Sequence, residues 1–347
     1  MINRSAEVAV IGGGHNGLVA AAYLARAGRR VSIFEARAEL GGAVASAEVF
    51  EGVAARLSRF SYLVSLLPTT VIDELGLQLE LRSRQVGSYT PVDTRGLLIE
   101  RHVGRATRDS FRALTGDGGE YQAWATFKER LHELAAVLEP TLTQRLPRVE
   151  ELRARVDAGL WSSLVEQPLG ELVESTFSDD TVRGLVLTDA LIGTFASAHD
   201  PSLRQNRCFL YHVIGNGSGE WRVPVGGMGA VTAELVRVAE EAKVMIRTGC
   251  TVESIEPLAD GGGSLRLANG ESITAETILA NCAPATLQRL LGEAYETPVG
   301  SQIKINIVLR RLPRFQSGID PAIGFAGTLH LGQGYDRLQQ AYEEAAA

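Results

Sequence analysis

The segment VAVIGGGHNGLVAAAYLARAGRRVSIFEAR, residues 8–37, constrains the fold more than any other part of the chain. Residues 6–12 have the apolar character of a buried parallel strand, and residues 30–35 that of a second strand. Residues 16–28 between them are typical of a helix that stops at Gly28. A G-x-G-x-x-G pattern joins the first strand to the helix, and in this context it predicts a dinucleotide-binding unit.

Each glycine of the pattern has its own physical role. Gly12 permits the tight turn, Gly14 lets the backbone approach a pyrophosphate, and Gly17 lets the helix lie close to the sheet. The helix N-terminus, which includes His15 and Asn16, offers free N–H groups and the positive end of a dipole to the phosphates. We therefore expect all five residues to border the cofactor.

Glu35 ends the second strand, 18 residues after Gly17. A carboxylate at this position can accept hydrogen bonds from both ribose hydroxyls of an adenosine, and it would repel the 2′-phosphate of NADP. Glu35 alone permits either FAD or NAD.

The residues after Glu35 favour FAD. An NAD domain usually continues into another helix and strand of the same sheet, whereas here two adjacent glycines, Gly41 and Gly42, follow almost at once. Such a pair indicates that the chain turns back across the cofactor with its backbone close to phosphate or flavin.

The rest of the chain changes character several times. The region 250–280 has short strands split by DGGG and NG turns, which predicts an antiparallel meander followed by a buried strand. Residues 105–195 are predicted to be mainly helical, 228–243 a helix after GGMG, and 196–220 loop-like. Residues 304–313, KINIVLRRLP, have the alternation of a strand, and the last residues that of a helix.

Composition excludes several classes of protein. The 347 residues are 45% hydrophobic with a net charge of −7, which is typical of a globular chain and argues against a nucleic-acid partner. No run of about 18 apolar residues occurs, so no transmembrane helix is predicted and a cytoplasmic location is expected. The three cysteines lack a C-x-x-C pattern, and the histidines lack metal-ligand spacing, so neither dithiol chemistry nor a metal site is predicted.

The opening VIGGGHNGLVAAAYLARAGRRVSIFEARAELGGA resembles that of phytoene desaturase and carotenoid isomerase-like flavoproteins, within the flavin amine oxidase superfamily. Its GGGHNGL form is most similar to the branch named pyridine nucleotide-disulfide oxidoreductase domain-containing protein 2. Further segments resemble that branch in the same order: RFSYLVSLLP, EWRVPVGGMGAVTAEL, TVESI and ILANCAP. The resemblance covers nearly all of the chain.

The resemblance implies roles for particular residues. Gly12, Gly14 and Gly17 would hold the FAD pyrophosphate, and Glu35 the adenosine ribose. Arg37, Gly41 and Gly42 would border the ribityl and phosphate region, and the expected cofactor-binding residues also include the neighbouring Ala36 and Ala43. Val252 matches a residue whose backbone pairs with adenine. A late family motif, G-D-x…P-G-G-G-x-x-x-A, is absent after Gly300, which leads us to expect that the substrate domain is incomplete at its C-terminus.

We expect an α/β fold, with an FAD/NAD(P)-binding Rossmann-like domain carrying an antiparallel β-meander and a discontinuous mixed α+β substrate domain. The FAD-binding domain would comprise residues 1–75 and 220–290, and the substrate domain residues 76–219 and 291–347.

Three functions remain open from the sequence. The first is an FAD-dependent oxidoreductase that transfers hydride from an apolar or amine-like small molecule to flavin, as a desaturase, oxidase or isomerase does. The second is a flavin-binding protein without turnover that acts through partners, and the third an NAD-dependent dehydrogenase. Peripheral contact with a membrane is compatible with the apolar stretch at 60–67. No catalytic residue is assigned, and for His212 in FLYHVIG a structural role is favoured over acid–base catalysis.

Overall fold

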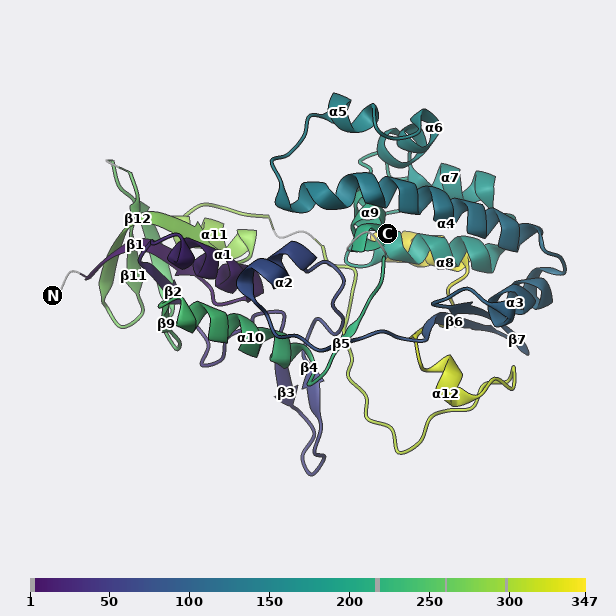
Figure 1. Cartoon of the computed structure of the whole chain (residues 1–347), viewed down its shortest axis with the longest axis horizontal. Coiled ribbons are helices and arrows are strands. Elements are labelled where there is room, and N and C mark those ends of the chain that lie inside the picture. The colour runs from purple at the N-terminus through teal and green to yellow at the C-terminus, as the bar shows by residue number, and fades with distance from the viewer. Residues whose placement is uncertain (1–3, 216–218, 260, 297–298) are drawn as a thin grey trace. The chain divides into compact units, whose positions relative to one another are not determined.

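The computed structural model describes residues 4–215, 219–259, 261–296 and 299–347. The chain forms two compact units, which Figure 1 draws with their elements labelled. The first unit comprises Met1–Val64, Thr69–Arg82 and Val223–Pro298, and the second Ser65–Pro68, Ser83–Arg222 and Val299–Ala347. Assignment of the second unit to substrate binding stays a prediction.

The first unit is built on a six-stranded sheet with the order β10-β11-β12-β1-β2-β9. Strands β12, β1, β2 and β9 run parallel, whereas β11 is antiparallel to both of its neighbours, β10 and β12. The strands are β1 (Arg4–Ile11), β2 (Val31–Phe34), β9 (Met245–Arg247), β10 (Val252–Pro257), β11 (Gly263–Leu267) and β12 (Ser272–Ala280). The predicted α/β class and the predicted meander are both confirmed, although Asp260 of the DGGG turn lies outside the described residues.

The position of β1 explains its apolar sequence. It pairs with β12 through Ala9 and Ile278 and with β2 through Val10 and Ile33. Val8, Ala9 and Val10 are all buried, because neighbouring elements cover both faces of a central parallel strand. Helices α1 (His15–Arg26) and α10 (Met228–Glu241) lie side by side against this sheet (Figure 1).

Shorter elements complete the first unit. They are the hairpin β3 (Ser46–Glu48) and β4 (Arg56–Ser58), helices α2 (Thr69–Leu75) and α11 (Pro284–Leu291), and the antiparallel pair β5 (Leu81–Arg82) and β8 (Val223–Pro224).

The second unit combines helices with a three-stranded sheet of the order β13-β6-β7. The strands are β6 (Val86–Val92), β7 (Arg95–Glu100) and β13 (Thr328–Leu329). The longer helices are α3 (Arg105–Thr115), α4 (Gly119–Leu138), α7 (Leu169–Thr176), α8 (Asp180–Leu191), α9 (Arg204–Ile214) and α13 (Tyr335–Ala346). Shorter helical segments are η1 (Glu139–Thr143), α5 (Val149–Arg153), α6 (Ala158–Trp161), η2 (Ser162–Glu166) and α12 (Pro321–Gly324).

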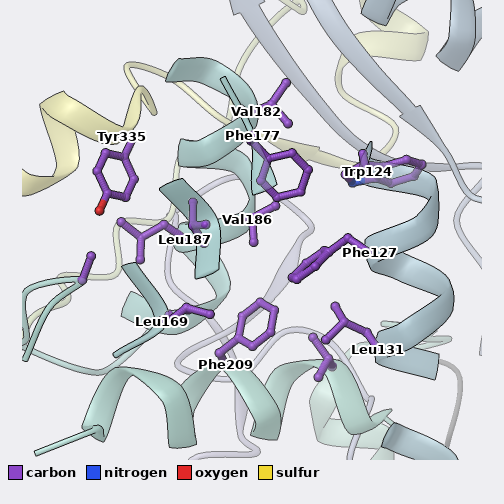
Figure 2. Close-up of a cluster of buried hydrophobic side chains, with 14 of the residues drawn as sticks. Trp124, Phe127, Leu131, Leu169, Phe177, Val182, Val186, Leu187, Phe209 and Tyr335 are labelled. Carbon is purple, nitrogen blue, oxygen red and sulfur yellow. The ribbon is translucent and has the colours of Figure 1, made fainter. Parts of the chain in front are cut away.

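The second unit has its own hydrophobic core. Figure 2 shows Phe127 and Leu131 of α4 turned toward Phe209 of α9, with Phe177 and Val186 above them. The rings of Phe127 and Phe177 meet edge to face, with centroids 5.5 Å apart. The side chains of this core all belong to the second unit, so the packing that stabilises it comes from its own residues.

Two sequence predictions are wrong. Within 196–220, of which residues 216–218 lie outside the described part, residues 204–214 form α9 rather than a loop. Its buried side chains include the polar Gln205 and Asn206, which hid the helical spacing of Phe209 and Val213. Residues 304–313 form no strand, because among the described residues no other strand pairs with them.

The helical core of the second unit predicts a large difference between two identical substitutions. Leu131→Ala removes a side chain that is 2% exposed, so we expect it to lower the free energy of unfolding by about 2–5 kcal/mol. Leu146→Ala alters a side chain that is 83% exposed, and the expected change is within about 0.5 kcal/mol. All three tryptophans belong to this unit, so denaturant unfolding followed by tryptophan fluorescence measures it. Equal losses would contradict the described core.

Candidate cofactor-binding site

The glycine turn lies at the carboxyl end of β1, where ligands of parallel α/β sheets bind. Gly12 has φ +100°, a backbone conformation that glycine tolerates and other residues rarely adopt. Gly14 is the N-cap of α1, and no described side chain caps the helix there. The first backbone N–H groups of α1 are therefore available to an anion.

His15 and Asn16 begin α1, as predicted. Asn16 is exposed, whereas His15 is partly buried. Burial lowers the pKa of His15 below its ordinary value of 6.5, so its imidazole is neutral at pH 7. A neutral ring avoids adding a second positive charge to the positive end of the helix dipole.

Glu35 supports the glycine turn directly. One of its carboxylate oxygens accepts a hydrogen bond of 2.7 Å from the backbone N–H of Gly13, and the other accepts one of 2.9 Å from the N–H of Arg37. A carboxylate has about four acceptor positions, so these two bonds leave capacity for ribose hydroxyls. A Cβ added to Gly13 would stand 2.3 Å from Leu40 Cδ2, so the leucine side chain would have to move to accommodate it.

The pair Gly41 and Gly42 brings the chain back onto the turn. The N–H of Gly41 donates to the carbonyl of Gly13 at 2.8 Å, and Gly41 forms a parallel bridge with Gly14. A Cβ added to Gly42 would lie 3.1 Å from Gly14 Cα. The backbone at 41–42 thus lies directly against the turn. The chain turns back as expected, and its closeness to the cofactor stays a prediction.

Ala36, Arg37 and Ala43 flank this return and are exposed. Val252 lies on β10 and is buried, 6% exposed, where it pairs with Leu267. Backbone hydrogen bonds from Gly249 to Arg37 and from Cys250 to Glu35, both 2.8 Å long, bring the start of β10 beside the acid. All of the predicted site residues therefore belong to the first unit.

Sequence reasoning assigned no role to Asn281. This residue follows β12, and its Nδ2 donates a hydrogen bond of 2.9 Å to the carbonyl of Gly12. The signal for it was its position: it directly follows a predicted buried strand, within ILANCAP.

The GGMG loop makes two contacts that the sequence did not predict. The N–H of Gly229 donates to Ser46 Oγ at 2.9 Å, and that of Met228 donates to Ser58 Oγ at 3.2 Å.

The contacts of His212 agree with the structural role expected from the sequence, which stays a prediction. His212 is buried in the second unit, with Nδ1 at 2.8 Å from the carbonyl oxygen of Cys208, and its ring stacks on Trp221 with centroids 5.3 Å apart. Within the part of the chain that the structure describes, no three His, Cys, Asp or Glu side chains gather as a metal site would require. None of the described helices is long and apolar enough to cross a membrane.

The sheet, the glycine turn and the meander together define a dinucleotide-binding α/β protein. Residues 17–317 match the model of the family described as flavin containing amine oxidoreductase. The chain belongs to this family, which confirms the expected oxidoreductase class and the expected flavin type of cofactor.

Individual relatives agree with this assignment. The chain is 41% identical over 364 residues to an uncharacterized protein of Mycobacterium tuberculosis, a match that covers 99% of the chain and 67% of the relative. It is 29% identical over 393 residues to the rat (Rattus norvegicus) pyridine nucleotide-disulfide oxidoreductase domain-containing protein 2, covering 98% and 67%. The predicted resemblance to that branch is confirmed. The chain spans about two thirds of the length of both relatives.

The fold is similar to that of putrescine oxidase, in a structure of the wild type bound to putrescine. The TM-score is 0.57 at 19% sequence identity, with 83% of this chain and 60% of that chain covered. The likeness confirms the predicted fold class, and this chain spans less than two thirds of the putrescine oxidase chain.

The return of the chain at Gly41 predicts a strong effect of one methyl group. Gly41 has φ +109°, and a Cβ there would lie 2.5 Å from Thr232 Oγ1. We expect Gly41→Ala to strain the backbone by about 1–3 kcal/mol and also to displace 41–42 from the turn, so that flavin binding weakens.

Gly28→Ala is the matched control, since Gly28 also has a positive φ of +86° but a Cβ there meets nothing within 4 Å. Calorimetric melting and flavin titration of both variants measure the effects. If the two variants lost equal affinity for flavin, contact with Thr232 would have no part in the site.

Proposed function

We propose that the chain binds FAD along the glycine turn and acts as an FAD-dependent oxidoreductase on an apolar or amine-like small molecule. The observation that carries this proposal is the return of Gly41 and Gly42 onto Gly13 and Gly14. This return places two chain segments without side chains beside each other, so that an extended dinucleotide could approach the backbone of both.

The residues at the turn fit such a cofactor. Gly12, Gly14 and Gly17 would hold the pyrophosphate with His15 and Asn16, through the first backbone N–H groups of α1 and the helix dipole. The N–H of Gly12 itself donates to the carbonyl of Phe34 at 2.9 Å, so Gly12 would contribute through the shape of the turn.

The return segment would complete the site. Glu35 would accept from the adenosine ribose, and Arg37, Gly41 and Gly42, flanked by Ala36 and Ala43, would border the ribityl and phosphate region. Val252, at the start of β10, would contact adenine through its backbone.

FAD, when bound, supplies the acceptor for a hydride from a substrate carbon. The contribution of this chain is to bind and orient the cofactor: Glu35 holds the turn and the ribose together, and α1 stabilises the negative charge of the phosphates. Membership of the flavin containing amine oxidoreductase family supports this reaction class.

The first test is the absorption spectrum of the purified chain, with the released cofactor identified after heat denaturation. We expect flavin absorption bands and released FAD, or both after incubation of the apoprotein with FAD. Bleaching of the flavin by a substrate under anaerobic conditions, screened with putrescine and with an apolar polyene, would establish turnover and its substrate class. A colourless chain that binds NAD and not FAD would overturn the proposal.

A second prediction concerns Glu35. Glu35→Ala removes the acceptor for the Gly13 N–H and for the ribose, and a hydrogen bond to a charged group contributes about 1.5–3 kcal/mol. We therefore expect FAD affinity to fall roughly 10- to 100-fold, measured by flavin fluorescence titration. Glu39→Ala is the matched control, because Glu39 is an exposed acid on the same segment. Equal affinity of the two variants would show that Glu35 does not contact the cofactor.

A further inference from the structure

Asn281 occupies a place that the topology of the sheet defines. Strand β12 ends at Ala280 and runs parallel to β1, so the carboxyl ends of both strands meet at one edge of the sheet. The backbone N–H of Asn281 extends this pairing by donating to the carbonyl of Ile11 at 2.8 Å. Asn281 is thereby fixed next to the glycine turn, although 269 residues separate it from Gly12.

Asn281 lies against all three glycines of the fingerprint. A Cβ added to Gly12 would stand 2.5 Å from the backbone carbonyl oxygen of Asn281. A Cβ on Gly14 or Gly17 would stand 3.3 Å or 2.5 Å from the side-chain Nδ2 of Asn281. The backbone of Asn281 therefore fills the space beside Gly12, and its side-chain amide fills the space beside Gly14 and Gly17.

The hydrogen bond from Asn281 Nδ2 fixes one particular peptide. Its acceptor is the carbonyl of Gly12, a residue with φ +100°. The Gly12 carbonyl and the Gly13 N–H belong to one planar peptide, and the Gly13 N–H donates to Glu35. Asn281 and Glu35 therefore fix the two polar groups of this peptide, and its orientation sets the course of the backbone into Gly14 and the first N–H groups of α1, which would bind phosphate.

We propose that Asn281 is a positioning residue of the pyrophosphate site, which holds the Gly12 peptide so that the turn presents its N–H groups to the diphosphate. This inference rests on the proposed function, since it assigns a role within the same dinucleotide site. Asn281 touches the turn and not the reacting atoms, so its effect is on binding and not on the chemical step.

The role of Asn281 can be tested by replacing the NH₂ group of its side-chain amide. Asn281→Asp keeps the shape but replaces the donor with a carboxylate oxygen facing the Gly12 carbonyl, and it adds a negative charge beside the phosphates. Asn281→Ala removes the donor without adding charge. We therefore expect Asp to weaken diphosphate binding more than Ala does.

Asn269→Asp is the matched control. Asn269 is an exposed residue of the same unit, and its Oδ1 accepts from the N–H of Glu271 at 3.0 Å. A carboxylate retains this acceptor, so the variant makes the same charge change away from the turn.

The experiment compares ADP, FAD and adenosine as ligands of the full chain by isothermal titration calorimetry, together with the melting temperature of each apoprotein. For Asn281→Asp we expect the dissociation constants of ADP and FAD to rise at least tenfold and that of adenosine less than twofold. Asn281→Ala is expected to show a smaller rise with the same selectivity, and Asn269→Asp no selective change.

Each other outcome decides against the inference or against the proposed function. If Asn281 variants bind ADP within twofold of the wild type, or lose ADP and adenosine equally as the melting temperature falls, Asn281 is only structural. If the wild type binds ADP but not FAD, the proposed function fails while the ADP series still tests Asn281. If the wild type binds neither ligand, both proposals are wrong.

Discussion

The parallel pairing of β1 with its two neighbours is the constraint on which the first unit depends. β12 on one side and β2 on the other run in the same direction as β1, so the three strands end at a common edge. The glycine turn, Glu35 and Asn281 directly follow these three ends. Residues from distant parts of the sequence therefore converge without any long side chain having to reach across the sheet.

The backbone of the glycine turn is held in place by three contacts to its polar groups. The turn is held by a carboxylate from the end of β2, by an amide from the end of β12 and by the backbone of Gly41. Each of these contacts takes up one hydrogen-bonding group of the turn that would otherwise be unpaired or free to rotate. Gly12 and Gly17 are needed because Asn281 approaches so closely that a Cβ at either position would stand 2.5 Å from one of its atoms. A preorganised site of this kind loses little conformational entropy when a ligand binds.

Local patterns made part of this structure predictable. The strand, glycine turn, helix and acid lie within about 30 consecutive residues, so their spacing alone predicts the unit. The adjacent glycines 41 and 42 likewise predicted the return of the chain. Asn281 could not be assigned in this way, because its place depends on β12 lying next to β1 in the sheet. The order of strands in a sheet is not contained in the local sequence of either strand.

The two errors have a related origin. Helix α9 was missed because buried polar side chains, Gln205 and Asn206, satisfy backbone groups of other segments: Asn206 Nδ2 donates to the carbonyls of Leu164 and Gln167. Their burial depends on tertiary contacts, which the local sequence does not contain. Residues 304–313 alternate between apolar and polar side chains as a strand does. They form no strand, because a strand also requires a neighbouring strand that pairs with its backbone.

The segment at 303–313, which belongs to none of the described strands, has a consequence for the behaviour of the chain in solution. Ile303, Ile305 and Ile307 are exposed by 89%, 74% and 69%, a pattern that would favour edge-to-edge association of two copies. The same stretch carries Lys304, Arg310 and Arg311, and antiparallel pairing with itself would bring these like charges together. The basic side chains thus oppose the self-association that the exposed isoleucines of this segment favour. Charged residues that flank an aggregation-prone segment commonly have this effect.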